Sequence, residues 1–374
     1  MRYTRATIDL QAIRDNLSTI KKSIVNPDKT NIIAVVKANA YGHGLVPVAK
    51  AAVNWGVSHL AVAIPEEGQL LRQAKITAPV IVLGLIPSED AELCVREKLI
   101  VTVSQPEHLE PLILAAKKLG QKACVMLKSD TGMHRIGADQ EGVVKLAKVI
   151  HANNNLDFYG LFTHFASAGG PDLSYAKLQA EKFQKLVKEM TELSLRPPFV
   201  TASASGASFT MPDCQFDLIR AGIAMYGLYP SDFLQQNYSL EPALRLSTNI
   251  SYLKKLPANT PVGYEMTYNT DKACYIATLP IGYGDGYSRR LSNKAKILVQ
   301  GEFYPLCGNI CMDQMMACLG PETTAKAGDE VVLVGKQGDN SISLEELAEI
   351  VGTINYELAC AITQRVPRIY INGN

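Results

Sequence analysis

Short apolar segments recur along the first 220 residues of the chain and predict a series of buried strands. Each segment is rich in β-branched or aromatic residues and lacks regular polar alternation, which is typical of strands covered on both faces. Eight such strands are predicted, at residues 32–36, 60–63, 80–83, 100–103, 123–127, 158–162, 199–201 and 216–219.

Segments with helical spacing lie between these strands. Residues 45–55, 106–119 and 173–193 carry apolar residues at helical intervals, and Pro47 stands near the start of the first, where a missing N–H does no harm. Eight strands alternating with helices predict a TIM-type (β/α)8 barrel, a fold that usually takes about 250 residues. A doubly wound parallel sheet is the alternative, because the order of strands cannot be read from a sequence.

The pattern changes near Pro242. Longer alternating segments follow at residues 246–253, 273–278, 295–299 and 330–334, and glycine-rich turns separate them, which predicts an antiparallel β domain. Ser343 and Glu346 form a capping-box pattern that predicts one late helix. We therefore expect a barrel over residues 1–240 and a β domain over 241–374, with the first ten or so residues as a candidate strand of the β domain.

Composition narrows the classes of function. The chain has 374 residues and a formal net charge of +1 with no basic block, so neither nucleic acid nor an anionic membrane is an expected partner. No apolar run approaches the roughly 18 residues of a membrane span, and the start of the chain has no signal-peptide core, so we expect a cytoplasmic protein. The eight cysteines are scattered, which favours reduced thiols. Cys307 and Cys311 alone are too few for a metal site, and no metal is expected.

Polar residues able to do chemistry follow the predicted strands. Barrel enzymes carry their active sites where the strands end, and they often bind phosphate after strands seven and eight. Lys37 follows the first strand, Ser205 the seventh and Gly222 the eighth, an arrangement that suits a lysine Schiff base with pyridoxal 5′-phosphate (PLP). Taken singly, a lysine after a strand or a Ser-Gly pair is more often a simple turn.

The segment 36–44, Val-Lys-Ala-Asn-Ala-Tyr-Gly-His-Gly, resembles the PLP-lysine motif of alanine racemases. The resemblance extends over essentially the whole chain. It includes residues 131–135, 163–165, 220–227, 263–265, 281–286, 310–314, 353–357 and 365–368, in the same order and at matching intervals.

This resemblance implies a (β/α)8 barrel followed by a β domain, in a homodimer with shared active sites. It implies interconversion of L- and D-alanine with PLP, supplying D-alanine for the bacterial cell wall. Lys37 would hold the cofactor, and Lys37 and Tyr264 of the partner subunit would be the two bases. It also assigns cofactor contacts to Tyr41, His164, Ser205, Arg220, Gly222, Ile223 and Tyr356, substrate contacts to Arg135 and Met312, a carbamylation site to Lys128, and the entrance to Tyr283 and Arg290.

The chain departs from the commonest family pattern at five positions. Ala204 stands where many members have asparagine, Thr201 where many have histidine, His134 where many have glycine, Asn309 where many have arginine, and Gly263 where many have serine. None of these changes removes a proposed base.

The expected chemistry explains the choice of residues. Racemisation removes a proton from one face of the α-carbon and returns one to the other, which two opposed bases can do without moving. Arg220 offers only hydrogen-bond donors, so a pyridine nitrogen beside it should stay unprotonated, which should limit side reactions such as transamination. The alternatives are a broad-specificity or serine-directed racemase, a barrel-type amino-acid decarboxylase, and a non-catalytic PLP carrier.

Overall fold

The structure is a computed structural model that describes residues 3–373. Its contacts form two compact units. The barrel unit contains residues 13–40 and 45–240, and the strand-rich unit contains residues 3–12, 41–44 and 241–373. Within residues 3–373, no helix has both the length and the apolar character needed to cross a bilayer.

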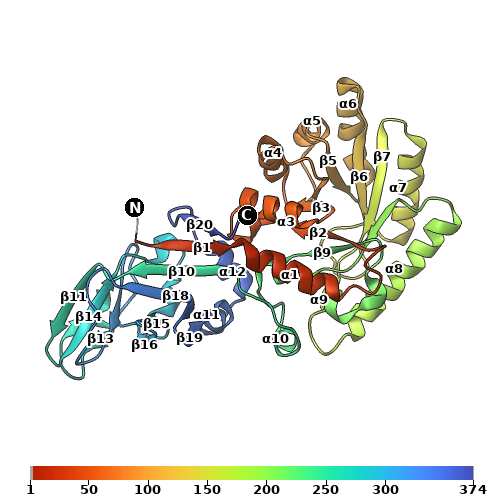
Figure 1. Cartoon of the computed structure of the whole chain (residues 1–374). Coiled ribbons are helices and arrows are strands. Elements are labelled where there is room, and N and C mark those ends of the chain that lie inside the picture. Colours follow the sequence, from red (N-terminus) through yellow and green to blue (C-terminus); the bar gives the residue numbers. More distant parts are fainter. Residues whose placement is uncertain (1–2, 374) are drawn as a thin grey trace. The chain divides into compact units, whose positions relative to one another are not determined.

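Eight parallel strands form the barrel, in the sheet order β8-β7-β6-β5-β4-β3-β2-β9 (Figure 1). A bridge between Ala204 and Arg220 links the two ends of this order, so the sheet is nearly closed. Because successive strands are neighbours and the sheet curls back on itself, the barrel prediction is confirmed and the doubly wound alternative is excluded. The strands are β2 (Asn31–Val35), β3 (His59–Val62), β4 (Val80–Val82), β5 (Leu99–Val103), β6 (Ala123–Lys128), β7 (Leu156–Phe162), β8 (Phe199–Thr201) and β9 (Leu218–Ala221).

Helices cover the outside of the barrel, as α7 and α8 do beside β7 in Figure 1. The predicted helix 45–55 coincides with α3, whereas the segment 106–119 begins with a short 3-10 turn before its helix. The main helices are α1 (Leu10–Lys22), α3 (Leu45–Trp55), α4 (Pro65–Gln73), α5 (Ala91–Arg96), α6 (Leu109–Leu119), α7 (Gln140–Ala152), α8 (Ser174–Glu192), α9 (Ser205–Thr210) and α10 (Asp232–Asn237).

Two strand ends differ from the prediction. Lys128 is the last residue of β6, paired with Phe162, and Arg220 lies inside β9, paired with Ile33 of β2. Both were expected just after their strands. The hydrogen-bonded ladder continues one or two residues further than the apolar pattern, because the barrel interior accepts these long basic side chains.

An aromatic cluster fills the barrel interior near the amino ends of its strands. His59 begins β3, and its Nε2 lies 2.7 Å from the Tyr159 hydroxyl of β7. The ring of Phe199, at the start of β8, is 5.1 Å from the His59 ring. Burial lowers the pKa of His59 to about 4, so the imidazole is neutral at neutral pH. Because this cluster fills the amino ends of the strands, we look for the reactive groups at their carboxyl ends.

The strand-rich unit contains three sheets. The largest has the order β16-β15-β18-β10-β1-β20, with β19 beside β18; the others are β11-β14-β17 and β12-β13. Pairing is antiparallel except between β1 and β20. The strands are β1 (Arg5–Asp9), β10 (Leu244–Asn249), β11 (Tyr252–Leu256), β12 (Pro261–Val262), β13 (Tyr268–Asn269), β14 (Cys274–Leu279), β15 (Lys296–Val299), β16 (Glu302–Pro305), β17 (Met315–Cys318), β18 (Glu330–Gln337), β19 (Asn340–Ile342) and β20 (Arg368–Ile371).

The segment 246–253, predicted as one strand, is divided between two. β10 pairs with β18 in the large sheet, whereas β11 pairs with β14 in the three-stranded sheet. The chain changes sheets at Ile250 and Ser251, whose N–H groups bond the carbonyls of Asp329 and Thr278. β10 is mostly buried, whereas the residues of β11 are exposed or half-buried, so the apolar pattern of the sequence does not mark the change of sheet.

The late helix is present as α11 (Leu344–Val351). The Ser343 hydroxyl accepts the N–H of Glu346 at 3.0 Å, as the capping pattern predicts. The Glu346 carboxylate lies 3.1 Å from Lys296 Nζ. A second helix, α12 (Asn355–Ala361), follows. The eight cysteines are free thiols, and residues 3–373 contain no cluster of three or more His, Cys, Asp or Glu side chains suited to a metal ion.

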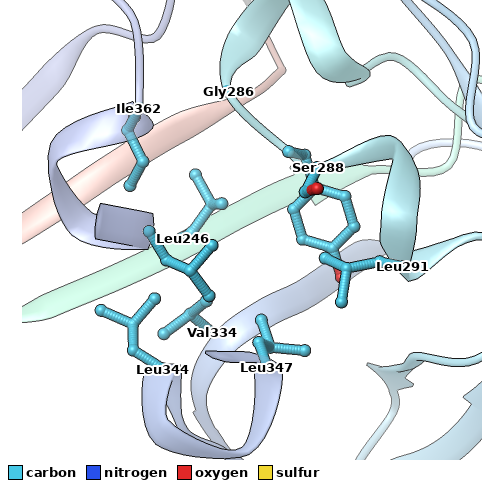
Figure 2. Close-up of a pocket in the computed structure, with 10 residues that line it drawn as sticks. Leu246, Gly286, Ser288, Leu291, Val334, Leu344, Leu347 and Ile362 are labelled. Atoms are coloured by element: carbon cyan, nitrogen blue, oxygen red, sulfur yellow. The ribbon is translucent and has the colours of Figure 1, made fainter. Parts of the chain in front are cut away.

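A small apolar cavity of about 20 Å³ lies inside the strand-rich unit. Figure 2 shows the side chains of β10, β18 and α11 pointing toward this space, with Leu291 and Ile362 beside them. Tyr287 also lines the cavity, and within residues 3–373 its buried hydroxyl has no hydrogen-bond partner. A single water would need two to four polar partners, which this lining does not supply.

Replacing Tyr287 with phenylalanine should stabilise the protein. A buried hydroxyl without a partner costs about 1–3 kcal/mol, and the change keeps the ring that packs against the cavity. We expect a gain of about 1 kcal/mol, which corresponds to a rise of about 2–4 °C in the Tm of a domain of this size. Calorimetry of the variant would measure it, with Tyr252→Phe as a control because Tyr252 is 59% exposed. An unchanged or lower Tm would show that the hydroxyl finds a partner.

Candidate functional site

The segment that carries Lys37 has an unusual backbone. Lys37 begins α2 (Lys37–Tyr41), just beyond β2, and the φ angles of Ala38, Asn39, Ala40 and Tyr41 are 52°, 54°, 54° and 52°. This left-handed turn contains no glycine, and each such residue costs roughly 1–2 kcal/mol. Strain of this kind persists where the surroundings hold it, and it gathers at functional sites.

Two polar side chains hold the left-handed turn from the barrel side. The Glu67 carboxylate, on α4, accepts the N–H of Ala63 at 2.9 Å and that of Asn39 at 3.3 Å. The Asn39 side chain in turn accepts the N–H of Leu45 at 2.8 Å, at the start of α3. Sequence reasoning missed Glu67, because its partner in the turn lies 28 residues away.

Positive groups gather near the carboxyl ends of β2, β6, β7 and β9. Lys128 is 4% exposed, and burial together with Arg135 and Arg220 lowers its pKa to about 7. Burial, together with the charges of Arg220 and Lys128, lowers the pKa of His164 to about 3. Lys37 contributes to both shifts, so the structure brings these five predicted residues into one electrostatic group. Such a group favours a neutral His164 and attracts anions.

Arg220 is held by neutral acceptors. Its Nη1 donates to Thr201 Oγ1 at 2.9 Å, and its Nη2 donates to the carbonyls of Thr163 and Ala202 and to His164 Nδ1, at 2.8, 2.9 and 3.2 Å. Burial lowers the pKa of Arg220 to about 9, which leaves it protonated at neutral pH. Within residues 3–373, Nε is the one guanidinium nitrogen for which the structure shows no partner.

The contact with Arg220 also fixes the tautomer of His164. A guanidinium only donates hydrogen bonds, so His164 Nδ1 must accept. The neutral ring therefore carries its proton on Nε2. The Thr201 hydroxyl accepts a hydrogen bond from Arg220 at a position where many family members have histidine. This departure therefore preserves an acceptor for the guanidinium.

A small cradle of donors lies where β8 and β9 end. Ser205 begins α9, and its hydroxyl oxygen accepts the N–H groups of Gly222 and Ala224 at 2.9 and 3.3 Å. The hydroxyl proton therefore remains available for donation. Ile223 begins a 3-10 turn, where amides have no partner within the helix. These groups suit an anion such as phosphate.

Two predicted phosphate ligands meet in the strand-rich unit. The rings of Tyr41 and Tyr356 have centroids 6.1 Å apart. Burial raises the pKa of both phenols, that of Tyr356 to about 12, so both hydroxyls stay protonated and can donate. An added Cβ at Gly42, whose φ is 82°, would lie 2.1 Å from the carbonyl oxygen of Ala359 on α12. The glycine therefore lets the Tyr41 segment approach the helix that carries Tyr356.

Tyr264 lies on an exposed loop with a strained backbone. Its side chain is 71% exposed, and the φ angles of Glu265 and Met266 are 61° and 52°. Asn309 Nδ2 donates to the Tyr264 carbonyl at 3.0 Å and to the Glu265 carboxylate at 2.9 Å. Asn309 was noted only as a departure from the family pattern, and the structure shows that it holds this loop. A Cβ at Gly263 would lie 2.9 Å from Met316 Cε, which favours glycine there.

The predicted entrance residues lie nearby in the same unit. Tyr283 and Gly284 donate their N–H groups to the carbonyls of Cys311 and Met312 at 3.1 and 2.9 Å. Met312 is 52% exposed and lies beside the Tyr283 segment. Arg290 donates to the Val351 carbonyl at 3.3 Å, so the structure shows it at the end of α11.

His134 takes a glycine-like conformation, with φ of 56°. The Asp130 carboxylate offsets this strain, because Oδ1 accepts the N–H groups of Gly132 and His134 at 2.9 and 3.1 Å. The imidazole is also 3.5 Å from Oδ2 of Asp130. This departure therefore leaves the loop before Arg135 well held.

Comparisons with known proteins agree along the whole chain. Residues 8–230 match the family "Alanine racemase, N-terminal domain" and residues 243–370 match "Alanine racemase, C-terminal domain". An alanine racemase of Halothermothrix orenii is 43% identical over 99% of this chain and 97% of its own. The structure of an alanine racemase from Bacillus anthracis with bound L-Ala-P superposes with a TM-score of 0.94 and 38% identity, covering 100% of this chain and 96% of that chain.

One similar structure carries a different activity in its name. A histidine racemase from Leuconostoc mesenteroides superposes with a TM-score of 0.91 and 29% identity, covering 99% of this chain and 98% of that chain. The fold therefore hosts racemases for more than one amino acid. Both halves of the chain match one family, and a relative above 40% identity spans nearly all of it. The chain belongs to the alanine racemase family.

Proposed function

We propose that this protein is a PLP-dependent alanine racemase that interconverts L- and D-alanine, acting in the cytoplasm to supply D-alanine for the cell wall. The observation that supports it most directly is the electrostatic group around Lys37. There a lysine on a strained turn joins Lys128, Arg135 and Arg220, and no carboxylate of the described residues 3–373 bonds to Arg220. Full-length similarity to curated alanine racemases supports alanine as the substrate.

The donor set fits PLP. Lys37 would attach the aldehyde, and the unpartnered Nε of Arg220 would face the ring nitrogen. When bound, the cofactor withdraws electrons from the α-carbon of the attached amino acid and so acidifies its α-hydrogen. The phosphate would be held by Tyr41, Ser205, Gly222, Ile223 and Tyr356. Tyr41, Ser205 and Tyr356 carry hydroxyl donors and Ile223 begins a 3-10 turn, whereas the Gly222 N–H donates to Ser205 Oγ in this structure.

Arg220 limits how strongly the bound ring can withdraw electrons. Its guanidinium donates to four neutral acceptors and stays protonated, so it cannot give a proton to a ring nitrogen. A weaker electron sink favours return of the proton to the α-carbon over transamination. Retention of the amino group is what a racemase needs.

The chain's own groups would move the proton. Lys37 shares its electrostatic group with Arg135 and Arg220, and its amine would act as the base on one face. Tyr264 of the partner subunit would act on the other face. His164 carries its proton on Nε2, and a hydrogen bond from there to a phenolate would stabilise the ionised base. Arg135 would hold the substrate carboxylate, with the Met312 backbone nearby.

A homodimer with shared sites is part of the proposal. Tyr264, Met266 and Met312 are 71%, 65% and 52% exposed on the strand-rich unit. Large apolar side chains exposed together are typical of surfaces that another protein covers. A second copy of this chain would cover them and would bring Tyr264 to the site that carries Lys37.

The proposed function is tested by chiral analysis of L-alanine incubated with the purified, PLP-loaded protein. Formation of D-alanine would support it. L-Serine and L-histidine run in parallel would test the runner-up, a broad-specificity or serine-directed racemase, which the fold of the histidine racemase makes worth measuring. Cofactor binding without any turnover would instead indicate a carrier, and release of carbon dioxide a decarboxylase.

Lys128 should react with carbon dioxide to form a carbamate. Carbamylation needs a neutral amine, and with a pKa of about 7 a large fraction of Lys128 is neutral at pH 7.5, against about 0.1% of an exposed lysine. The carbamate would place a negative charge among Arg135, Arg220 and Lys37. We expect a carbamate signal by ¹³C NMR in ¹³C-bicarbonate, rising as the pH rises through 7 and lost on acidification.

The Lys128→Arg variant is the control, since it keeps the charge and cannot form the adduct. We expect it to lose the NMR signal. A signal of equal size in the variant would assign the carbamate to another lysine. No signal in the wild type would show that Lys128 acts as an amine.

A further inference from the structure

Helix α8 carries a buried glutamine that contacts two of the loops described above. Gln179 is 1% exposed. Its Oε1 accepts the N–H of Ala166 at 2.9 Å, and its Nε2 donates to the His164 carbonyl at 3.2 Å and to Thr131 Oγ1 at 3.5 Å. A backbone N–H must face the amide oxygen and a carbonyl the amide nitrogen, so these partners fix the orientation of the side chain. Gln179 thus joins the segment after β6 to the segment after β7.

Tyr175 lies one turn earlier on the same face of α8. Its hydroxyl donates to the Gly132 carbonyl at 2.7 Å. Gly132 has a φ of 139°, and an added Cβ would lie 2.6 Å from the Tyr175 oxygen and 3.3 Å from Gln179 Cγ. Tyr175 and Gln179, which we call the α8 clamp, therefore hold the Thr131–Gly132 backbone between them.

The bonds of the α8 clamp lead on to Arg220. Thr131 Oγ1 lies 2.8 Å from Thr163 Oγ1, and the Thr163 carbonyl accepts Arg220 Nη2 at 2.8 Å. Thr131, Thr163 and Arg220 are all buried. A buried chain of hydrogen bonds in which every member is satisfied rigidifies the segments that it joins.

We propose that the α8 clamp is a positioning device for the active site, an inference that rests on the proposed racemase function. Arg135 is exposed, four residues beyond Thr131, so its position depends on the anchors at the base of its loop. The clamp holds the first residues of this loop, Thr131 and Gly132, next to the segment after β7 that carries His164. Neither Tyr175 nor Gln179 has to touch the substrate for this role.

Loss of the clamp should weaken substrate binding more than it slows turnover, because Arg135 would hold the substrate carboxylate. A displacement of about 1 Å in a positioning group can cost up to about 100-fold in rate. For Gln179→Met, which keeps the length of the side chain and removes its hydrogen bonds, we expect kcat/KM to fall about tenfold, mostly through KM. Tyr175→Phe removes one hydroxyl from a half-exposed side chain, so it should fold normally and show a smaller change in the same direction.

Trypsin provides a readout that does not depend on catalysis. Cleavage after Arg135 requires the loop to open, so the PLP-loaded variants should be cut there about fivefold faster than wild type, relative to cleavage elsewhere in the chain. Gln184→Met is the matched control, because Gln184 is exposed on the same helix. If the clamp only stabilised the fold, its loss would accelerate cleavage at all sites alike.

The outcomes separate this inference from the proposed function. Wild-type racemisation combined with variants that match Gln184→Met in KM and in cleavage after Arg135 would overturn the positioning role and leave the racemase intact. Faster cleavage after Arg135 in the variants, with no racemisation by wild type, would show that the clamp holds the loop while the proposed reaction is wrong. Faster cleavage with a raised KM supports both.

Discussion

Replacing Lys37 with alanine should abolish racemisation and the covalent attachment of PLP. The variant loses the amine that would bind the cofactor and serve as one base, and general-base and nucleophilic roles are together worth at least about 10³-fold. Reduction of the PLP-loaded protein with borohydride, followed by peptide mass spectrometry, would place the cofactor on Lys37 in wild type and find none in the variant. Chiral analysis of alanine gives the loss of activity.

The control for this variant is Lys50→Ala, an exposed lysine on neighbouring α3. It should retain both activity and attachment. Added methylamine should restore part of the activity of Lys37→Ala by supplying the missing amine, which would distinguish a chemical loss from misfolding. Retention of the cofactor on another lysine, with activity near that of wild type, would show that the assignment of Lys37 is wrong.

The barrel was predictable because its strands are buried on both faces. Apolar runs such as residues 80–83 are typical of buried strands, and α3 has the bounds predicted from its helical pattern, Leu45–Trp55. Strand ends were harder to place. The segment 216–219 was predicted as a strand, but Phe216 has a φ of 42° and lies before β9, while the buried Arg220 continues the strand. A basic residue interrupts the apolar pattern of the sequence even where the hydrogen bonds of the sheet continue through it.

The positions of the candidate site residues along the fold were predictable, and the contacts that hold them were much less so. Lys37 and Ser205 stand where strands end, and strand ends can be counted along a sequence. Ala38 and Ala40 have no intrinsic preference for the left-handed region, so their turn depends on contacts with distant residues. In the sequence, Gln179 cannot be told from the other polar residues of an amphipathic helix, because its partners Thr131 and His164 lie on loops far from it along the chain.

Replacing Tyr264 with phenylalanine should lower racemisation by about 10²–10⁴-fold, the usual contribution of a general acid or base. The ring remains, so the fold and the cofactor should be unaffected. With one base left, the variant can still remove and return a proton on the face of Lys37. In deuterated water, NMR should therefore show α-hydrogen exchange without inversion for one enantiomer of alanine only. Equal exchange of both enantiomers would favour a single mobile base.

Mixing the Lys37→Ala and Tyr264→Phe variants would test whether Tyr264 acts across subunits. If each site uses Lys37 of one chain and Tyr264 of the other, a mixed dimer has one site with both defects and one site with none. Random exchange of subunits makes half the dimers mixed, so activity should recover to about one quarter of wild type. If both bases come from one chain, every site in the mixture has a defect and no recovery follows. The exposed position of Tyr264 leads us to expect recovery.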